Sequence, residues 1–266
     1  MPFTIMGVVN VTPDSFSDGG RYLDARAAIA HGEQLAAQGA HILDVGGEST
    51  RPGSDPVPAE EELHRVVPVV EGLVPAGARI SVDTSKAAVA AAALDAGADY
   101  VNDVSAFRAD PDLAGLVADR GVDCCLMHML GTPRTMQDDP RYDDVVADVK
   151  AFLEERLAHA VSEGVAEERV MLDPGIGFGK TVEHNLELLA RLGELAALGR
   201  PLVVGVSRKS FLGRITGRDV GGRAVATAAA NVLAFERGAT VFRVHDVPET
   251  LDALTVAAAT LAADGP

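Results

Sequence analysis

Polar and ionisable side chains follow directly after eight short apolar runs along the chain. Some are hydrogen-bond acceptors: Asp83, Asn102 and Asp173 combine two carboxylates with an amide, which suits a flat heterocycle that presents several N–H groups. Others are cationic donors, which suit an anion such as a mono- or diphosphate. The cationic donors are Arg51, Lys209, Arg243 and His245. We therefore predict a site for a ligand that has a hydrogen-bonding ring at one end and a phosphate at the other.

The segment 169–185 is the most informative of these places, because an apolar run there ends in Asp173 and a glycine-rich loop follows. Glycine lets a backbone turn tightly or approach a ligand closely, and Thr181 then begins a predicted helix. The Gly-Lys-Thr triplet at 179–181 is similar to the end of a nucleotide-binding phosphate loop. That motif requires glycine at the position of Pro174, so we reject this interpretation.

The apolar runs are rich in Val, Ile and Leu, as is typical of buried parallel strands. The predicted strands are residues 5–9, 41–45, 79–82, 100–101, 122–127, 170–172, 201–206 and 240–244. Helical patterns lie at 24–38, 59–73, 85–94, 111–119, 143–163, 182–192, 222–237 and 248–261. This alternation predicts the α/β class and one domain over residues 1–266, a (β/α)₈ TIM barrel. A doubly wound open sheet is the alternative, but it usually has fewer strands and a G-x-G-x-x-G first turn, which is absent here.

In a barrel of this kind the carboxyl ends of all strands meet at one face, where the active site lies. The polar residues after the runs should therefore share one mouth, although a single one such as Asp83 could simply cap the next helix. Two long connections rich in Gly, Ser and Pro, 12–22 and 49–56, are predicted to act as mobile lids over this mouth. Phe16 and Arg51 would be carried by these lids.

The net charge and composition of the chain exclude several classes of binding partner and cellular location. A net charge of −16 argues against nucleic acid or an anionic membrane as a partner. The N-terminus has no evident signal peptide, and no apolar run is long enough to span a bilayer. The only cysteines, Cys124 and Cys125, are adjacent and too close for an ordinary disulfide. We expect a soluble cytoplasmic protein that acts on small molecules.

We interpret His128 and Cys125 as structural residues rather than as a metal ligand and a nucleophile. His128 has no second histidine at ligand spacing, so we reject a zinc site and read residues 127–129 as a strand end that faces the pocket. Cys125 has no evident base partner, and we read it as core filler rather than as a nucleophile.

Long, ordered motifs resemble the dihydropteroate synthase family. They are MGVVNVTPDSFSDGG at 6–20, DVGGESTRPG at 44–53, SVDTSK at 81–86, NDVSA at 102–106, MHMLGTPRTMQ at 127–137, LDPGIGFGKTVEHN at 172–185, GVSRKSFLG at 205–213 and RVHDV at 243–247. The resemblance also implies the barrel. It implies an enzyme that joins 6-hydroxymethyl-7,8-dihydropterin diphosphate to para-aminobenzoate and releases pyrophosphate in folate synthesis. Mg²⁺ on the diphosphate, a homodimer and inhibition by sulfonamides are further expectations.

The resemblance assigns roles to residues that match the motifs. The expected pterin contacts are Asp83, Asn102, Asp173 and Lys209. The expected diphosphate contacts are Arg243 and His245, and the expected magnesium ligand is Asn10. The para-aminobenzoate site would be bordered by Thr50, Arg51, Pro52 and Ser210, with Phe178 as an apolar wall. The expected catalytic residues are Asp83, Lys209, Arg243 and His245.

Two departures from the family pattern are expected to change loop shape rather than the reaction. Leu130 stands where many members carry glutamine, and Ala106 and Phe107 replace a common glycine pair.

Two other functions remain as alternatives. A non-catalytic pterin- or phosphate-binding paralogue would be expected to lack Lys209, Asp83 or the 12–22 loop, all of which are present. A methyltetrahydrofolate-dependent methyltransferase uses a similar barrel, but it should lack the diphosphate-facing residues 243–245 and the pair 50–51.

Overall fold

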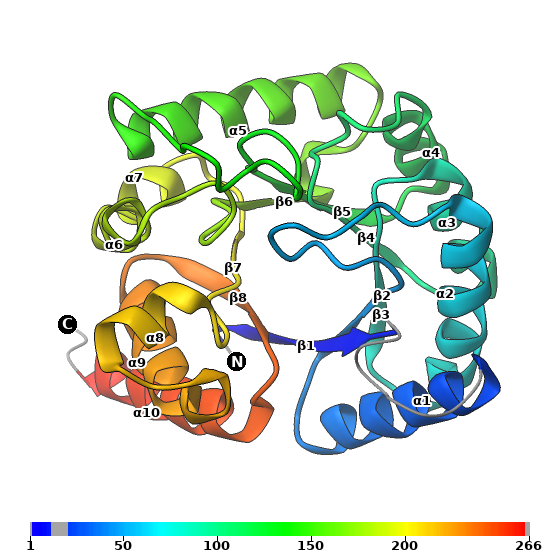
Figure 1. Ribbon diagram of the computed structural model, residues 1–266, viewed down its shortest axis with the longest axis horizontal. Helices are drawn as coiled ribbons and strands as arrows, with labels where there is room; N and C mark the ends of the chain where they lie inside the picture. Colours follow the sequence, from blue (N-terminus) through cyan, green and yellow to red (C-terminus); the bar gives the residue numbers. More distant parts are fainter. Residues whose placement is uncertain (1, 12–20, 264–266) are drawn as a thin grey trace.

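A computed structural model of the chain describes residues 2–11 and 21–263. Its eight strands are β1 Thr4–Asn10, β2 Ile42–Gly46, β3 Arg79–Asp83, β4 Tyr100–Asp103, β5 Asp123–Met127, β6 Val170–Asp173, β7 Leu202–Val204 and β8 Ala239–Val244. Each strand pairs in parallel with the next, and β8 pairs with β1 to close the barrel (Figure 1). The predicted (β/α)₈ barrel is therefore confirmed, and the open sheet is excluded.

Helices form an outer ring around the barrel (Figure 1). Eight of them match the predicted helices: α1 Arg21–Ala37, α2 Ala59–Leu73, α3 Ala87–Ala96, α4 Asp112–Arg120, α5 Val145–Ser162, α6 Val182–Ala190, α9 Ala224–Glu236 and α10 Val247–Ala263. The short helices α7 Gly193–Ala196 and α8 Ser210–Thr216 were not predicted, because so few residues carry no helical period. Short 3₁₀ helices also lie within the described residues, namely η2 Val74–Ala76, η3 Glu167–Arg169 and η4 Val220–Gly222. No helix of the described ranges is both long and apolar enough to cross a membrane.

Strand β7 is shorter than the predicted 201–206. It shares a single register pair with β6, between Leu172 and Leu202, and its register against β8 shifts between Leu202 and Val203. The chain leaves the sheet before Gly205, which lies in the wall of the mouth.

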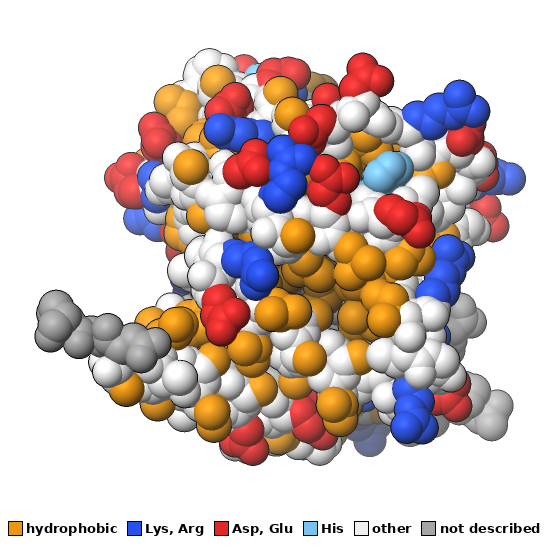
Figure 2. All heavy atoms as spheres, turned by 90° about the vertical axis from the view of Figure 1, so that its left-hand side faces the viewer, with side chains coloured by type: hydrophobic (Ala, Val, Ile, Leu, Met, Phe, Trp, Pro, Cys, Tyr) orange, Lys and Arg blue, Asp and Glu red, His pale blue; other side chains and the backbone are white. Residues whose placement is uncertain are grey.

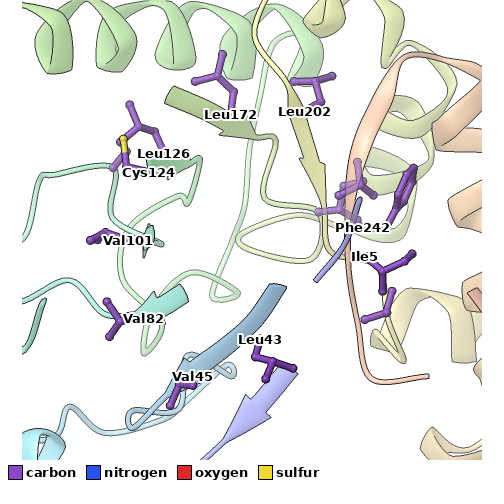
Figure 3. Packing of buried hydrophobic residues seen from close by; sticks show 14 of the residues in the cluster. Ile5, Leu43, Val45, Val82, Val101, Cys124, Leu126, Leu172, Leu202 and Phe242 are labelled. Carbon is purple, nitrogen blue, oxygen red and sulfur yellow. The ribbon is translucent and has the colours of Figure 1, made fainter. Parts of the chain in front are cut away.

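Side chains alternate between the two sides of each barrel strand. One set packs with helix residues such as Val66 and Leu153 in the main core, and Figure 3 shows strand residues of this set, among them Leu43 and Leu172. The other set fills the inside of the barrel with a buried apolar layer. This layer consists of Met6, Ile42, Tyr100, Cys125, Val203 and Val241. Cys125 is thus a core residue, as predicted, and burial raises the pKa of its thiol well above the usual range.

The strand period places the polar residues above this inner layer. Two residues beyond Ile42, Tyr100, Met171 and Val241 come Asp44, Asn102, Asp173 and Arg243. A step of two residues keeps a side chain on the same side of a strand, so these four point into the mouth of the barrel.

The connection 47–58 between β2 and α2 reaches across the mouth toward the β5–α5 connection (Figure 1). Gly53 N donates to Pro133 O at 3.1 Å, and Arg134 lies 3.7 Å from Asp55. In this arrangement the predicted lid 49–56 lies over one side of the mouth. Most of the other predicted lid, 12–22, lies outside the described residues.

The turn after β4 has an unusual backbone. Ala106 and Phe107 have φ of 53° and 60°, in the left-handed region that glycine adopts far more easily. Asp103 accepts hydrogen bonds from the backbone of Ser105 and Phe107, and Arg156 donates to Ala106 O at 2.8 Å. These contacts hold the turn in its shape without the glycine pair that is common in the resembling family.

Candidate active site

Arg243 on β8 is the centre of a polar layer inside the mouth. Its Nε donates to Asp44 Oδ2 at 2.6 Å, and its Nη2 donates to Asp83 Oδ2 at 2.7 Å. Asn102 Nδ2 donates to the same Asp44 oxygen at 3.0 Å. Four residues from β2, β3, β4 and β8 are thus joined in one network. Asp44 is not among the predicted site residues, and the signal that could have found it is the two-residue step from Ile42.

Eight of the twelve predicted site residues line one cavity of about 60 Å³ at this mouth. They are Thr50, Asp83, Asn102, Asp173, Phe178, Lys209, Arg243 and His245. The other lining residues are Val104, Met127, Gly205 and Ser207. Positions that are far apart in the sequence therefore share one site, as the barrel prediction requires.

The other four predicted site residues do not line this cavity. Arg51 and Pro52 are exposed on the 47–58 connection, and Ser210 is exposed at the start of α8. Asn10 is half-buried at the end of β1, opposite Gly46, which in turn pairs with Asp83. All four lie outside the lining of the cavity as the chain stands, and their predicted contacts remain predictions.

The floor of the cavity has more acceptors than cations. Burial raises the pKa of Asp83 to about 8, although the attraction to Arg243 acts to lower it. Burial by itself would lower the pKa of Arg243, but Asp44 and Asp83 outweigh it and raise that pKa. Because one guanidinium is divided between two buried carboxylates, neither is fully compensated. The floor is suited to a ligand that brings N–H donors.

Lys209 and Asp173 stand at the side of the cavity next to the glycine-rich β6–α6 connection. Lys209 Nζ donates to Ile176 O and lies 4.4 Å from the centroid of the Phe178 ring. Burial lowers the pKa of Lys209 to about 8, against the attraction of Asp173. Asp173 Oδ1 accepts from Gly175 N at 2.7 Å, and burial raises the pKa of this carboxyl. This side of the cavity thus combines a donor, an acceptor and an aromatic wall.

The surroundings of His245 disfavour a cationic ring in the free protein. Burial, with help from Arg243 and Arg208, lowers its pKa to about 4. Ser207 Oγ accepts from His245 N at 3.1 Å and lies 3.0 Å from His245 Nδ1, so its own hydrogen is available to Nδ1. A hydroxyl that donates to Nδ1 in this way would leave the ring proton on Nε2. This environment does not favour the cationic His245 that the residue type suggests.

Two polar residues from the same strand ends do not face the cavity. His128 follows the inward-facing Met127 and so points outward, where its Nδ1 lies 2.9 Å from Lys180 Nζ and its ring packs on Phe152. Asp103 follows Asn102 and binds the turn after β4. The interpretation of residues 127–129 as facing the pocket is correct for Met127 and wrong for His128, because neighbouring strand residues point to opposite sides.

A larger cavity of about 490 Å³ lies beside the first, beneath the 47–58 connection. The two cavities share Thr50, Asp83 and Val104 as lining residues. The mouth therefore has room for a ligand larger than the inner cavity alone.

The few possible metal ligands at the rim are compatible with a magnesium ion that would be held mainly by a substrate. Within residues 2–11 and 21–263, no three His, Cys, Asp or Glu side chains form a group that could hold a metal. Mg²⁺ commonly keeps several waters and takes few protein ligands alongside substrate phosphates. The half-buried amide of Asn10 at the rim fits the role of a single protein contact.

We predict that His245 titrates near pH 4 and that inorganic pyrophosphate raises this pKa, because a nearby anion favours imidazolium. The folded protein favours the neutral ring more than the unfolded chain does. The contribution of His245 to the free energy of unfolding is therefore complete above about pH 6.5 and is lost as the pH falls toward 4. Nitrogen-15 NMR of the ring measures both effects, with the exposed His64 as the reference signal. Titration near pH 6.5 without a response to pyrophosphate would contradict the assignment.

Known proteins match both the sequence and the structure. A family model described as pterin binding enzyme matches residues 6–245. Dihydropteroate synthase of Escherichia coli K12 is 46% identical over 260 residues, which cover 97% of this chain and 92% of that protein. The Mycobacterium leprae enzyme is 49% identical over 267 residues, with 98% and 94% covered.

Solved structures of the same enzyme agree. Xanthomonas albilineans dihydropteroate synthase with 4-aminobenzoic acid has a TM-score of 0.92 and 51% identity, and the match covers 97% of this chain and 93% of that one. The complex of that enzyme with 7,8-dihydropteroate has a TM-score of 0.89 and 48% identity, with 97% and 94% covered. The resemblance seen in the motifs is confirmed, and the chain belongs to the pterin-binding enzyme family, among the dihydropteroate synthases.

Proposed function

We propose that this chain condenses 6-hydroxymethyl-7,8-dihydropterin diphosphate with para-aminobenzoate to give 7,8-dihydropteroate and pyrophosphate in folate biosynthesis. The observation that carries the proposal is the single cavity in which an acceptor-rich floor meets cationic and neutral donors. Relatives solved with 4-aminobenzoic acid and with 7,8-dihydropteroate support the same reaction.

The pterin ring binds at the acceptor-rich floor. Asp83, Asn102 and Asp173 offer oxygens to its N–H and amino groups, and Lys209 offers a donor to an acceptor of the ring. Desolvated acceptors that remain unpaired cost free energy, so a ring with complementary donors is bound selectively. Donors that reach Asp83 favour its ionised form and lower the raised pKa of this carboxyl.

The reaction exchanges one bond to the pterin methylene carbon for another. The carbon–oxygen bond to the diphosphate breaks, and its electron pair leaves with the pyrophosphate. The arylamine nitrogen forms the new carbon–nitrogen bond and then loses a proton to solvent. Positive charge grows on the methylene and the ring, where the Asp83 carboxylate stabilises it, while Arg243 and the Nε2–H of His245 donate to the leaving group. Removing one such donor typically costs about 10²–10³ in rate.

Magnesium completes the proposed site, with Asn10 as its protein contact. When bound, the ion would neutralise charge on the diphosphate. The arylamine needs no strong base from the protein, because it is mostly neutral near pH 7.

The arylamine binds on the outer side of the pterin, against Phe178, Lys209 and Thr50, which already line the cavity. Arg51, Pro52 and Ser210 lie at the rim. Ligand pockets usually measure about 300–1,000 Å³, whereas the inner cavity measures about 60 Å³. Binding of both substrates therefore requires Lys209 and the 47–58 connection to shift, and the neighbouring cavity provides the room.

The two alternative functions gain no support from the site. Asp83 and Lys209, whose loss would mark a non-catalytic paralogue, both line the cavity. Arg243 and His245, which a methyltransferase would not need, line it as well.

We further propose that two copies of the chain associate through the face formed by α6, α8, α9 and α10. Hydrophobic side chains gather on this side of the molecule, around a hollow (Figure 2). The exposed apolar residues of these helices are Leu186, Ile215, Val225, Leu233, Val256 and Leu261. An apolar surface of this kind commonly marks a protein interface, and the same face on two copies can pair about a twofold axis. A cytoplasmic location is also proposed, in keeping with the free buried thiols Cys124 and Cys125.

Purified protein given both substrates and Mg²⁺ should release one pyrophosphate for each 7,8-dihydropteroate formed. EDTA should abolish the release, and Asn10→Ala should raise the magnesium concentration needed for half-maximal rate. Coupled pyrophosphate detection and chromatography of the product measure these quantities. The absence of turnover by the unmodified protein at every pH between 6 and 9 would refute the proposed reaction.

Asp173→Ala should weaken binding of the pterin diphosphate by about 5- to 150-fold, which corresponds to about 1–3 kcal/mol for donors left unpaired in a buried site. Calorimetry measures the affinity, and the exposed Asp139→Ala is the matched control. Equal affinities of the Asp173 and Asp139 variants would show that the ring does not bind at this carboxylate.

Sedimentation should find a dimer for the unmodified chain and a monomer for Val225→Glu, because this residue is 80% exposed at the start of α9, a helix of the proposed interface. Val161→Glu, which alters an exposed residue on α5, is the control and should remain dimeric. A monomer at every concentration of the unmodified chain would contradict the proposed association.

A further inference from the structure

The β6–α6 connection, residues 174–181, is fixed by side chains that bind its backbone carbonyls. Five consecutive carbonyls, from residue 175 to residue 179, each accept a hydrogen bond from a side chain. Lys180 Nζ donates to Gly175 O at 2.9 Å and to Phe178 O at 3.0 Å, Lys209 Nζ donates to Ile176 O, Gln137 Nε2 donates to Gly177 O at 3.0 Å, and Tyr142 OH donates to Gly179 O at 2.7 Å. Such a dense set of side-chain donors is unusual for a surface connection, whose carbonyls normally bind water.

The path of this connection leaves little freedom. Gly175, Gly177 and Gly179 all have positive φ, between 63° and 86°. A Cβ on Gly175 would lie 1.8 Å from His128 O, and one on Gly179 would lie 2.6 Å from Leu130 Cβ. The connection is therefore packed directly against the start of the β5–α5 connection.

Lys180 holds the inside of this connection. The residue is buried, and its Nζ lies 2.9 Å from His128 Nδ1 in addition to its two carbonyl partners. None of these partners is a carboxylate, so an ordinary salt bridge does not explain why a lysine is buried here. Its contacts instead tie the two ends of the glycine-rich turn to β5 through His128.

The opposite side of the same connection forms part of the proposed active site. Phe178 and Lys209 line the cavity, and Lys209 reaches Ile176 O while its Nζ lies 4.4 Å from the Phe178 ring. Gln137 and Tyr142 bind the outer side at Gly177 O and Gly179 O, one on each side of Phe178. A change in these donors would move the aromatic wall without touching Asp83 or Asn102.

We propose that Gln137, Tyr142 and Lys180 are positioning residues that fix Phe178 and Lys209 for the arylamine substrate. The inference rests on the proposed function. Asp83 and Asn102 at the pterin end lie on β3 and β4, away from this connection, so the positioning residues should affect the second substrate more than the first.

The test uses kinetics of the full chain with Gln137→Ala and Tyr142→Phe. Gln137 is exposed and Tyr142 half-buried, so both variants should fold. Loss of one hydrogen bond of about 1 kcal/mol corresponds to about a fivefold effect, and the KM for para-aminobenzoate should rise by about that factor. The calorimetric affinity for the pterin diphosphate should change less than this KM, and the Tm should stay close to that of the unmodified chain. Gln137→Glu, which keeps the shape but removes the donor, should behave like Gln137→Ala, whereas Gln137→Arg should restore the KM.

The matched control is Arg141→Ala, in the same connection as Gln137 and Tyr142, where the exposed Arg141 binds only Asp139 among the described residues. If Gln137→Ala and Tyr142→Phe show the same KM as this control, the inference is wrong. It is also wrong if KM, kcat, pterin affinity and Tm all deteriorate together, because the donors would then serve general stability.

A measurement that needs no turnover separates this inference from the proposed function. The chain has no tryptophan, so Phe178→Trp introduces a single tryptophan into the connection, whose fluorescence can be excited apart from that of the tyrosines. Adding Gln137→Ala and Tyr142→Phe to this variant should increase quenching by acrylamide, while adding Arg141→Ala should not. If the unmodified chain shows no turnover but quenching increases, the reaction is refuted and the positioning supported. If the unmodified chain turns over but quenching is unchanged, the reaction is supported and the positioning refuted.

Discussion

The hydrogen-bonded ion pairs between one guanidinium and two carboxylates fix the positions of the side chains at the mouth of this barrel. Arg243 reaches from β8 to Asp44 on β2 and Asp83 on β3, and Asn102 joins the same Asp44 oxygen. Buried charges are stable only when the surrounding groups satisfy them, so the four side chains fix one another's positions. The network is incomplete, since one cation serves two acids. The carboxylate oxygens of the network can therefore accept further hydrogen bonds, such as those from the N–H groups of a pterin ring.

The strand period explains most of what could be predicted from the sequence. Eight apolar runs gave the barrel, and the residue at each carboxyl end gave the candidate site. A stricter use of the two-residue period would have separated Asn102 and Met127, which point inward, from Asp103 and His128, which point outward. It would also have drawn attention to Asp44, two residues beyond the inner core residue Ile42.

Other features depend on contacts that no local pattern contains. Thr50 lines the cavity while Arg51 and Pro52 are exposed, because bonds such as that of Gly53 to Pro133 set the path of their connection. The lowered pKa of His245 follows from burial and from neighbouring guanidinium groups, which the residue type cannot reveal. Helix α8 is too short to carry a period of its own.

The turn at Ala106 and Phe107 has a consequence for the evolution of the chain. Each left-handed residue other than glycine costs roughly 1–2 kcal/mol, and the carboxylate of Asp103 binds the backbone that adopts this conformation. With glycine at both positions the turn would form with less help. The acceptable substitutions at position 103 therefore depend on which residues occupy 106 and 107. The three positions are epistatic, and homologues with different residues in this turn should not exchange them one at a time without loss.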